Sequence, residues 1–367
     1  MDNGVIKIKR INAVDVLRGF AISAILFIHS SNHFLYSSMP QNSPDWLSQL
    51  DEVLKSFLYF LFEGKAYSVF ALLFGFTYAL QLDKRMAKGL DMKYRMIWRM
   101  FLLVLFGFLN AAFFAGGDSL IFYALCMIPV IFLRHVKNKV LFGVGLFFLA
   151  QPFEWLNYAF HLFGDSYGVF YENVGNILKS GDFVETVKMN VTDGVKGCLL
   201  WALQTGRLSQ TLGLFCFGML AYRTDYFIKN ISFYKQLTFY FLMLFVLLYT
   251  ILFVVDNIPV RLYYNLSFSA FIINLLLFIY YKSFNISFWK YIMVYGRVSL
   301  TNFIGQSVIC SFLFYPWGLH LGGVAGTSIS MIFAFFVWII QIYFSYVWLN
   351  CHKQGPLEYL WHKWTWI

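Results

Sequence analysis

Apolar residues run along this chain in long blocks, which short polar and basic stretches interrupt. A helix needs about 20 mostly apolar residues to cross a bilayer. The pattern therefore predicts an all-α polytopic membrane protein, with about ten transmembrane helices around an interior cavity in a single domain, 1–367. The predicted spans are 13–36, 65–82, 97–115, 118–133, 140–163, 199–222, 236–256, 260–281, 291–315 and 325–350.

Three segments fall outside these spans. Segment 46–62 is predicted as an amphipathic or re-entrant approach to the second span. Segment 164–198 is the longest connection; it fits an extracytoplasmic cap, an interfacial helix or a solvated connector. Segment 351–367 is predicted as a cytoplasmic interfacial tail, because tryptophans gather at membrane interfaces and it carries Trp361, Trp364 and Trp366.

Composition and charge agree with the membrane interpretation. The chain is 60% hydrophobic and 13% charged, with 44 Phe, 24 Tyr and 11 Trp, which excludes an ordinary soluble protein. Of its 28 Lys and Arg, 19 fall in one alternating set of loops and 5 in the other. The positive-inside rule then predicts both termini in the cytoplasm. The net charge of +10 would face anionic lipid, so no nucleic-acid partner is expected.

Two ionisable residues mark the first predicted span. Eleven helical steps separate Arg18 from His29, which places both on one face about 16 Å apart. Ionisable groups inside a bilayer usually face a cavity, so the pair is a candidate functional site. A structural alternative stays open, in which Arg18 pairs with Asp15 or reaches the headgroups and His29 is a hydrogen-bonded core residue.

Other polar residues in the spans also allow two interpretations. Asp118 either caps a helix or orients a substrate at a cavity mouth, and Lys65 belongs either to a loop ion pair or to a site. Arg207, and Asn302 with Gln306, lie on polar stripes of the sixth and ninth predicted spans. Interhelical hydrogen bonds explain such stripes more often than substrate contact does.

No metal site is predicted. His29 and His33 make an i, i+4 pair without an apparent third ligand, and the five cysteines show no CxxC spacing. Phosphate-binding loops and the catalytic motifs of soluble enzymes are also absent from the sequence.

Five ordered blocks resemble the YeiB-like family of bacterial inner-membrane proteins, the domain of unknown function 418. The blocks are Val14–Ala21, Gly64-Lys65 leading to Leu72–Gly75, Gly117–Leu120 with Tyr123-Ala124, Gly296–Asn302 with Gln306-Ser307, and Gly355–Glu358. The spacing from Arg18 to His29 is also similar to a first-helix signature of acyltransferase-3 enzymes. The lysosomal heparan glucosaminide acetyltransferases carry a comparable histidine. These resemblances imply an inner-membrane acyltransferase.

In those relatives an acyl group passes from cytoplasmic acyl-CoA to an acceptor at the opposite face. The resemblance implies that acyl-CoA, with acetyl-CoA favoured, is the donor substrate here and that no metal takes part. His29 and Asp118 are then the expected catalytic residues. Arg18, Arg207 and Arg297 are expected to bind the donor, and Asn302, Gln306 and Lys65 to bind a glycan or other small hydroxyl or amine acceptor.

Two other function classes remain open at this stage. The polar stripes could line the path of a transporter or flippase. The chain has few prolines and no visible symmetry between its halves, and both features count against a transporter. A non-catalytic membrane scaffold or sensor is the third possibility. Membrane lipid is an expected partner in every case, and a homo-oligomer is possible.

Overall fold

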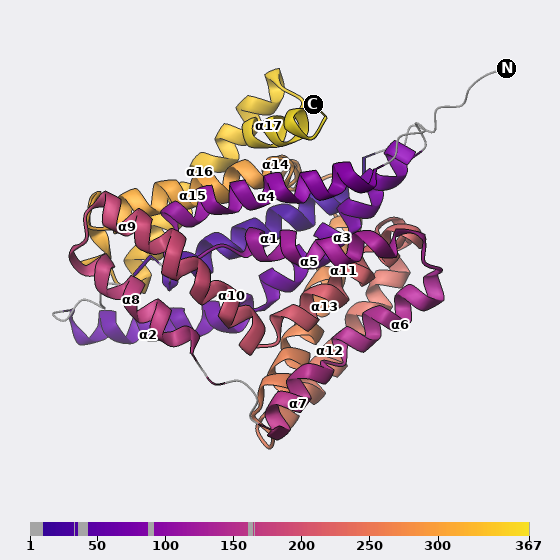
Figure 1. Cartoon of the computed structure of the whole chain (residues 1–367), viewed down its shortest axis with the longest axis horizontal. Helices are drawn as coiled ribbons and strands as arrows, with labels where there is room; N and C mark the ends of the chain where they lie inside the picture. Colours follow the sequence, from indigo (N-terminus) through magenta and orange to yellow (C-terminus); the bar gives the residue numbers. More distant parts are fainter. Residues whose placement is uncertain are drawn as a thin grey trace.

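The computed structural model of the chain describes residues 10–32, 34–35, 43–86, 92–160, 164 and 166–366. Throughout these ranges the regular structure is helical, without a β-strand, which confirms the predicted all-α fold (Figure 1). The α-helices are α1 (Asn12–Ser31), α2 (Asp45–Phe62), α3 (Lys65–Met86), α4 (Lys93–Phe113), α5 (Ser119–Ile131), α6 (Asn138–Leu149), α7 (Pro152–Phe160), α8 (Tyr167–Ser180), α9 (Phe183–Met189), α10 (Val195–Gln204), α11 (Arg207–Arg223), α12 (Ile231–Leu252), α13 (Ile258–Lys282), α14 (Ser287–Arg297), α15 (Ser299–Phe314), α16 (Thr327–Cys351) and α17 (Pro356–Thr365). Short helical turns η1 (Phe132–His135), η2 (Asn190–Gly194), η3 (Tyr226–Ile228) and η4 (Leu321–Gly323) join some of them.

Seven segments of the described chain are long and apolar enough to cross a membrane, against the ten predicted. They are Asn12–Ser31, Asp45–Lys84, Tyr94–Phe113, Asn138–Phe160, Ile231–Leu252, Ile258–Lys282 and Thr327–Cys351. Two shorter apolar helices, Ser119–His135 and Ser299–Phe314, lie near further predicted spans. The chain is therefore a polytopic membrane protein by the length and composition of its helices.

Breaks in the helical backbone explain why the structure has fewer long helices than predicted. The predicted span 199–222 divides at Gly206, whose φ of 76° ends α10 and starts α11. The predicted span 291–315 divides at Val298, whose φ of −109° and ψ of 37° lie outside the helical range. Span 118–133 holds the 13 residues of α5 followed by the turn η1. Hydropathy averages over such breaks and so predicts one long helix.

The long connection 164–198 is helical where the structure describes it. Helices α8 and α9 lead through η2 into α10. Val174, Leu178 and Thr186 are buried, and Asn190 Nδ2 donates a 3.2 Å hydrogen bond to the carbonyl of Ala112 in α4. This segment is consequently a packed cap of helices rather than a solvated connector.

Helix α1 lies among α3, α14, α15 and α16. Its middle is buried, and Leu17, Ala21 and Ile22 have no exposed surface. Close approach to α14 depends on two glycines. An added Cβ at Gly19 would overlap the Ile292 carbonyl, and one at Gly296 would overlap the backbone of Asp15 and Gly19. These contacts bring the part of α1 that carries Arg18 next to the end of α14 that carries Arg297.

We expect Gly296→Val to destabilise the protein by about 1–3 kcal/mol or more, since overpacking forces backbone movement. The obstructing atoms belong to the α1 backbone and cannot move aside as a flexible side chain would. Thermal unfolding in detergent measures the effect. Gly143→Val is the matched control, because an added Cβ there has nothing within 4 Å. Equal melting temperatures for the two variants would contradict this packing.

Candidate functional site

Two cavities lie at the two ends of α1. The first, here called the arginine cavity, has a volume of about 260 Å³. Among the described residues its cationic lining comprises Arg10, Arg18, Arg99, Arg297 and Lys353, and its one acidic lining residue is Glu358. Lys353 and His362 at its rim are exposed. The cavity therefore suits an anionic ligand that enters from the surface.

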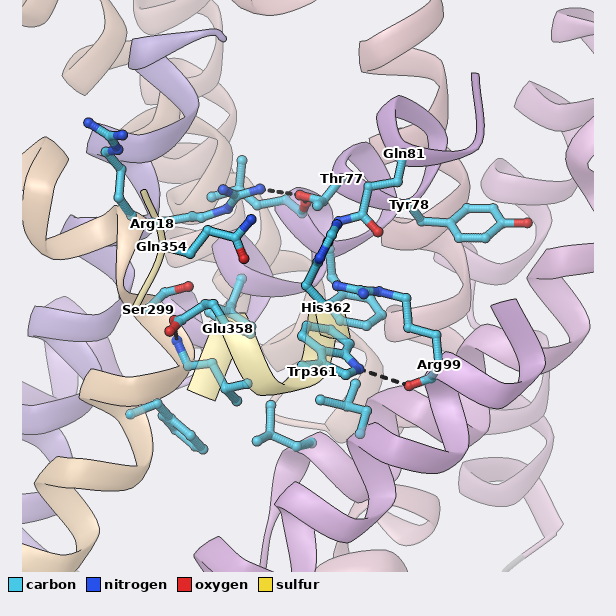
Figure 2. Close-up of a pocket in the computed structure, with 18 of the residues that line it drawn as sticks. Arg18, Thr77, Tyr78, Gln81, Arg99, Ser299, Gln354, Glu358, Trp361 and His362 are labelled. Atoms are coloured by element: carbon cyan, nitrogen blue, oxygen red, sulfur yellow. Dashed lines mark hydrogen bonds between the residues drawn. The ribbon is translucent and has the colours of Figure 1, made fainter. Parts of the chain in front are cut away.

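Arg18 is held in place by two partners within this cavity. Its Nη1 lies 3.1 Å from Asp15 Oδ1, and its Nη2 donates to Thr77 Oγ1 of α3 (Figure 2). Asp15 also pairs with Arg10, so one buried carboxylate serves two guanidinium groups. The predicted pairing with Asp15 is thus confirmed, yet it leaves a net positive charge facing the cavity.

The carboxy-terminal helix α17 forms one wall of the arginine cavity (Figure 2). The centroid of the Trp361 ring lies 3.6 Å from Arg99 Cζ, and Trp361 Nε1 donates a 3.1 Å hydrogen bond to the Arg99 carbonyl. Glu358 accepts hydrogen bonds from the Leu300 amide at 2.6 Å, the Thr301 amide at 3.1 Å and the Thr301 hydroxyl at 2.6 Å. Trp361, predicted as a membrane-interface anchor, also stacks on Arg99.

Glu358 should make the docking of α17 depend on pH. Burial raises the pKa of this carboxyl above its ordinary value, against the lowering effect of its hydrogen bonds to Thr301 and Leu300. A raised folded-state pKa means that stability falls as pH rises from the ordinary glutamic-acid range through the folded-state pKa. We expect wild-type melting temperature to fall relative to Glu358→Gln across that interval. Parallel melting curves for the two proteins would contradict the assignment.

The second cavity, here called the histidine cavity, has a volume of about 580 Å³. His29 lines it and stacks on Phe114 with ring centroids 4.4 Å apart. Aromatic rings make up much of the remaining wall, among them Tyr67, Tyr123 and Trp201. Phe70 and Phe303 line both cavities, so the two meet at these rings.

Arg207 is the buried cation of the histidine cavity. It begins α11 directly after the break at Gly206 and is 7% exposed. Its Cζ lies 5.3 Å from the rings of both Tyr67 and Trp201, and its Nη1 donates a 2.7 Å hydrogen bond to Gln210 Oε1. Arg207 was predicted to bind the donor together with Arg18, but the structure places the two in different cavities.

Asp118 lines neither cavity. Its carboxylate is buried and accepts a hydrogen bond from the Leu120 amide, which makes it the cap of α5. Its neighbours Gly117 and Ser119 do line the histidine cavity. Of the two interpretations of this residue, helix capping matches the geometry.

Lys65 also lines neither cavity. Its Nζ donates to the Tyr59 carbonyl at 3.4 Å and lies 5.0 Å from the Tyr264 ring, with Phe60 and Phe268 also near. Such cation–π contacts stabilise a buried ammonium group. The structure therefore gives Lys65 a packing position behind the cavity wall, which Glu63 and Gly64 line in its place.

Asn302 and Gln306, the two candidate polar residues of α15, differ in their hydrogen bonding. Asn302 donates to the Tyr295 carbonyl at 3.1 Å and to Ser345 Oγ at 2.9 Å, which ties α15 to α14 and α16. Gln306 is fully buried, and its amide has no hydrogen-bond partner among the described residues. Neither residue lines the histidine or the arginine cavity, where substrate contact was expected.

Sequence patterns did not identify Arg10, Arg99 and Glu358 as site residues. Each lies in or beside a predicted loop or tail, where a basic or acidic residue normally faces water. The docking of α17 against α4 and α15 brings Arg99 and Glu358 to the cavity, and Arg10 is held there by its ion pair with Asp15. No group of three or more His, Cys, Asp or Glu able to hold a metal occurs in the described part of the chain; His33 lies outside it.

Comparisons with known proteins give a family and three relatives. Residues 221–367 match the family model described as protein of unknown function (DUF418). The chain is similar to the uncharacterized protein YxaH of Bacillus subtilis (strain 168), 25% identical over 98% of this chain and 95% of the relative. It is also similar to the uncharacterized protein YeiB of Escherichia coli (strain K12), 29% identical over 96% and 95%. A 39.9 kDa protein in the amylase 3′ region of Bacillus acidopullulyticus is 26% identical over 97% and 94%. No solved structure matches.

Proposed function

We propose that this chain, which matches the DUF418 family model over residues 221–367 and is similar to YeiB, is an integral membrane acyltransferase. The proposed donor is acyl-CoA in the arginine cavity, and the proposed acceptor is a small hydroxyl or amine compound in the histidine cavity. The observation that carries the proposal is the pairing of a basic cavity with a histidine-lined cavity along one helix.

The arginine cavity suits the charged part of the donor. Arg18 and Arg297 offer planar guanidinium groups, which recognise phosphate oxygens better than point charges do. At about 260 Å³ the cavity would hold the pyrophosphate and the adjoining part of the pantetheine arm. The adenosine would remain at the exposed rim near Lys353 and His362. The thioester would then point toward Phe70 and Phe303, where the two cavities meet.

His29 is the proposed general base. Its imidazole would take the proton from the acceptor O–H or N–H while the oxygen or nitrogen attacks the thioester carbonyl carbon. The new ester or amide bond forms, the C–S bond breaks, and coenzyme A leaves as a thiolate that is then protonated. Imidazole suits this work because its ordinary pKa lies near neutral pH. Phe114 would hold the ring orientation through stacking.

The proposed reaction requires a defined orientation in the membrane. We place the protein in the bacterial cytoplasmic membrane with both termini inside, which puts the arginine cavity on the cytoplasmic side where acyl-CoA is made. The excess of basic residues in one set of loops supports this orientation.

In a Cys351→Ser background we expect a membrane-impermeant thiol reagent to label Lys179→Cys in intact cells. Lys139→Cys should react only after the cells are opened, because it lies at the start of α6, next to a loop assigned to the cytoplasm. Both lysines are exposed, and Cys351 is the exposed native cysteine among the described residues. The opposite labelling pattern would invert the assigned orientation.

The transfer itself can be measured in proteoliposomes. Labelled acetyl-CoA is supplied on the side of the arginine cavity, and candidate acceptors on the other. Acylated product should appear only when both are present, together with free coenzyme A in equal amount. Release of coenzyme A without an acceptor product would indicate hydrolysis and contradict the proposal.

A transporter is the second candidate, because two cavities separated by aromatic rings also fit a closed permeation path. The same proteoliposomes distinguish the two functions. Solute uptake without acylated product, reduced by Arg18→Gln, would favour transport. Acylated product with the label retained in an ester or amide bond would favour the acyltransferase.

A further inference from the structure

Arg207 is a buried guanidinium group that forms no ion pair among the described residues, and the Glu63 carboxylate of the same cavity acts on it only at longer range. It is 7% exposed and lines the histidine cavity. No carboxylate of the described residues forms an ion pair with it, and Nε has no hydrogen-bond partner. Aromatic stacking on Tyr67 and Trp201 offsets only part of the cost of burying such a charge. A buried arginine in a membrane protein needs partners for its charge, and here the Gln210 amide oxygen accepts one hydrogen bond but supplies no negative charge.

A chain of hydrogen bonds orients this side chain. Gln210 Oε1 accepts from Arg207 Nη1 at 2.7 Å, and Gln210 Nε2 donates to Ser68 Oγ at 3.0 Å. Ser68 in turn donates to the Gly64 carbonyl at 2.8 Å. The guanidinium group is therefore fixed before any ligand arrives, which lowers the entropy cost of binding.

A second nitrogen donor converges on the same place. A Cβ added at Gly64 would lie 3.0 Å from Arg207 Nη2 and 3.0 Å from Asn265 Nδ2. Gly64 has a φ of 72° and lines the cavity together with both residues. The absence of a side chain at this glycine leaves the two nitrogens facing a common space at the cavity wall.

We propose that Arg207 and Asn265 form an oxyanion site in the histidine cavity, which binds a carboxylate or phosphate group of the molecule that occupies it. This inference rests on the proposed function only in naming that molecule as the acyl acceptor. The acceptor would then be an anionic compound, held by its acidic group while a hydroxyl or amine faces His29. A planar guanidinium and an amide match the geometry of two oxyanion oxygens.

Two other charged residues line this cavity, and neither forms an ion pair with Arg207. Arg261 is exposed and already bound to Asp256, with Nη2 2.7 Å from each carboxylate oxygen. Glu63 also lines the cavity, is exposed, and repels an anion. Glu63→Gln should consequently tighten anion binding by about 2- to 5-fold, the range for an exposed charge.

Calorimetric titration in nanodiscs tests the site directly, without acyl-CoA. The probes are glucuronate and glucose, two sugars that differ in the carboxylate. We expect glucuronate to bind and glucose to bind much more weakly. Arg207→Gln should weaken glucuronate about 10- to 100-fold, and Arg207→Lys should recover part of the loss. Lys188→Gln, an exposed change of equal charge outside both cavities, should have no effect.

Two further comparisons locate the anion and identify its source. Arg18→Gln should keep glucuronate binding, because Arg18 lies in the other cavity. If a phospholipid headgroup is the natural ligand, phosphatidylglycerol nanodiscs should compete with glucuronate and phosphatidylcholine nanodiscs should not. Equal affinities in both would identify a free solute. Either result supports the oxyanion site.

Equal affinity for glucuronate and glucose in the wild-type protein would overturn the inference, whether or not the variants fold. The inference would also be overturned if Arg18→Gln lost glucuronate binding while a folded Arg207→Gln protein kept it. If acyl transfer is absent while glucuronate still binds, only the proposed function is rejected. If acyl groups are transferred to neutral acceptors and no anion binds, only the inference of an oxyanion site is rejected.

Discussion

Replacing His29 with alanine is expected to lower acyl transfer by about 10²- to 10⁴-fold, the usual contribution of a general base. The side chain lines the histidine cavity and is only partly buried, so its loss should leave the fold intact. Transfer of labelled acetyl groups in proteoliposomes measures the rate. His29 does not line the arginine cavity, so the variant should bind acetyl-CoA like the wild type.

That binding measurement is the control for the His29 prediction. A variant that melts normally and binds acetyl-CoA but transfers slowly has lost chemistry rather than structure. Wild-type transfer rates in a folded His29→Ala protein would remove this histidine from the mechanism, while parallel loss of binding and transfer would show a general disturbance of the bundle.

Replacing both Arg18 and Arg297 with glutamine is expected to weaken acyl-CoA binding by about 10²-fold or more, since each charged hydrogen-bonding contact is worth about 1.5–3 kcal/mol. The KM for acyl-CoA should rise while kcat changes little, because neither side chain lines the histidine cavity. Titration with acetyl-CoA in detergent and initial-rate kinetics measure the two quantities.

Lys290→Gln serves as the matched control for this pair. Lys290 lies on α14 with Arg297 and carries the same charge, but it is exposed, contacts Tyr346 and lines neither cavity. Equal weakening by Lys290→Gln would mean that the overall charge of this face, and not the arginine cavity, attracts the donor. A fall in kcat at saturating donor would place the two arginines in the chemical step.

The helical membrane fold could be predicted from the sequence, because long apolar blocks have few other stable forms. The number of long helices could not. Gly206 and Val298 interrupt helices through their local dihedral angles, and an apolar average does not report these. The interruption at Gly206 matters for the site, because it lets Arg207 start a new helix at the cavity wall.

The candidate site could be predicted in part. The sequence identified Arg18 and His29 as one stripe of a buried helix, and each does line a cavity. It predicted a single interior cavity, but Phe70 and Phe303 lie where two cavities meet, and Asp118 caps its own helix and lines neither cavity. Arg99 and Trp361 meet across a separation of 262 residues, a contact that no local pattern reports.

A density map of the purified protein with bound acetyl-CoA would test the proposed donor site most directly. We predict phosphate density beside Arg18 and Arg297, with the thioester directed toward Phe70 and Phe303 and so toward the cavity of His29. Acetyl-CoA density elsewhere on the protein, or an arginine cavity that stays without ligand at saturating acetyl-CoA, would contradict the acyltransferase proposal.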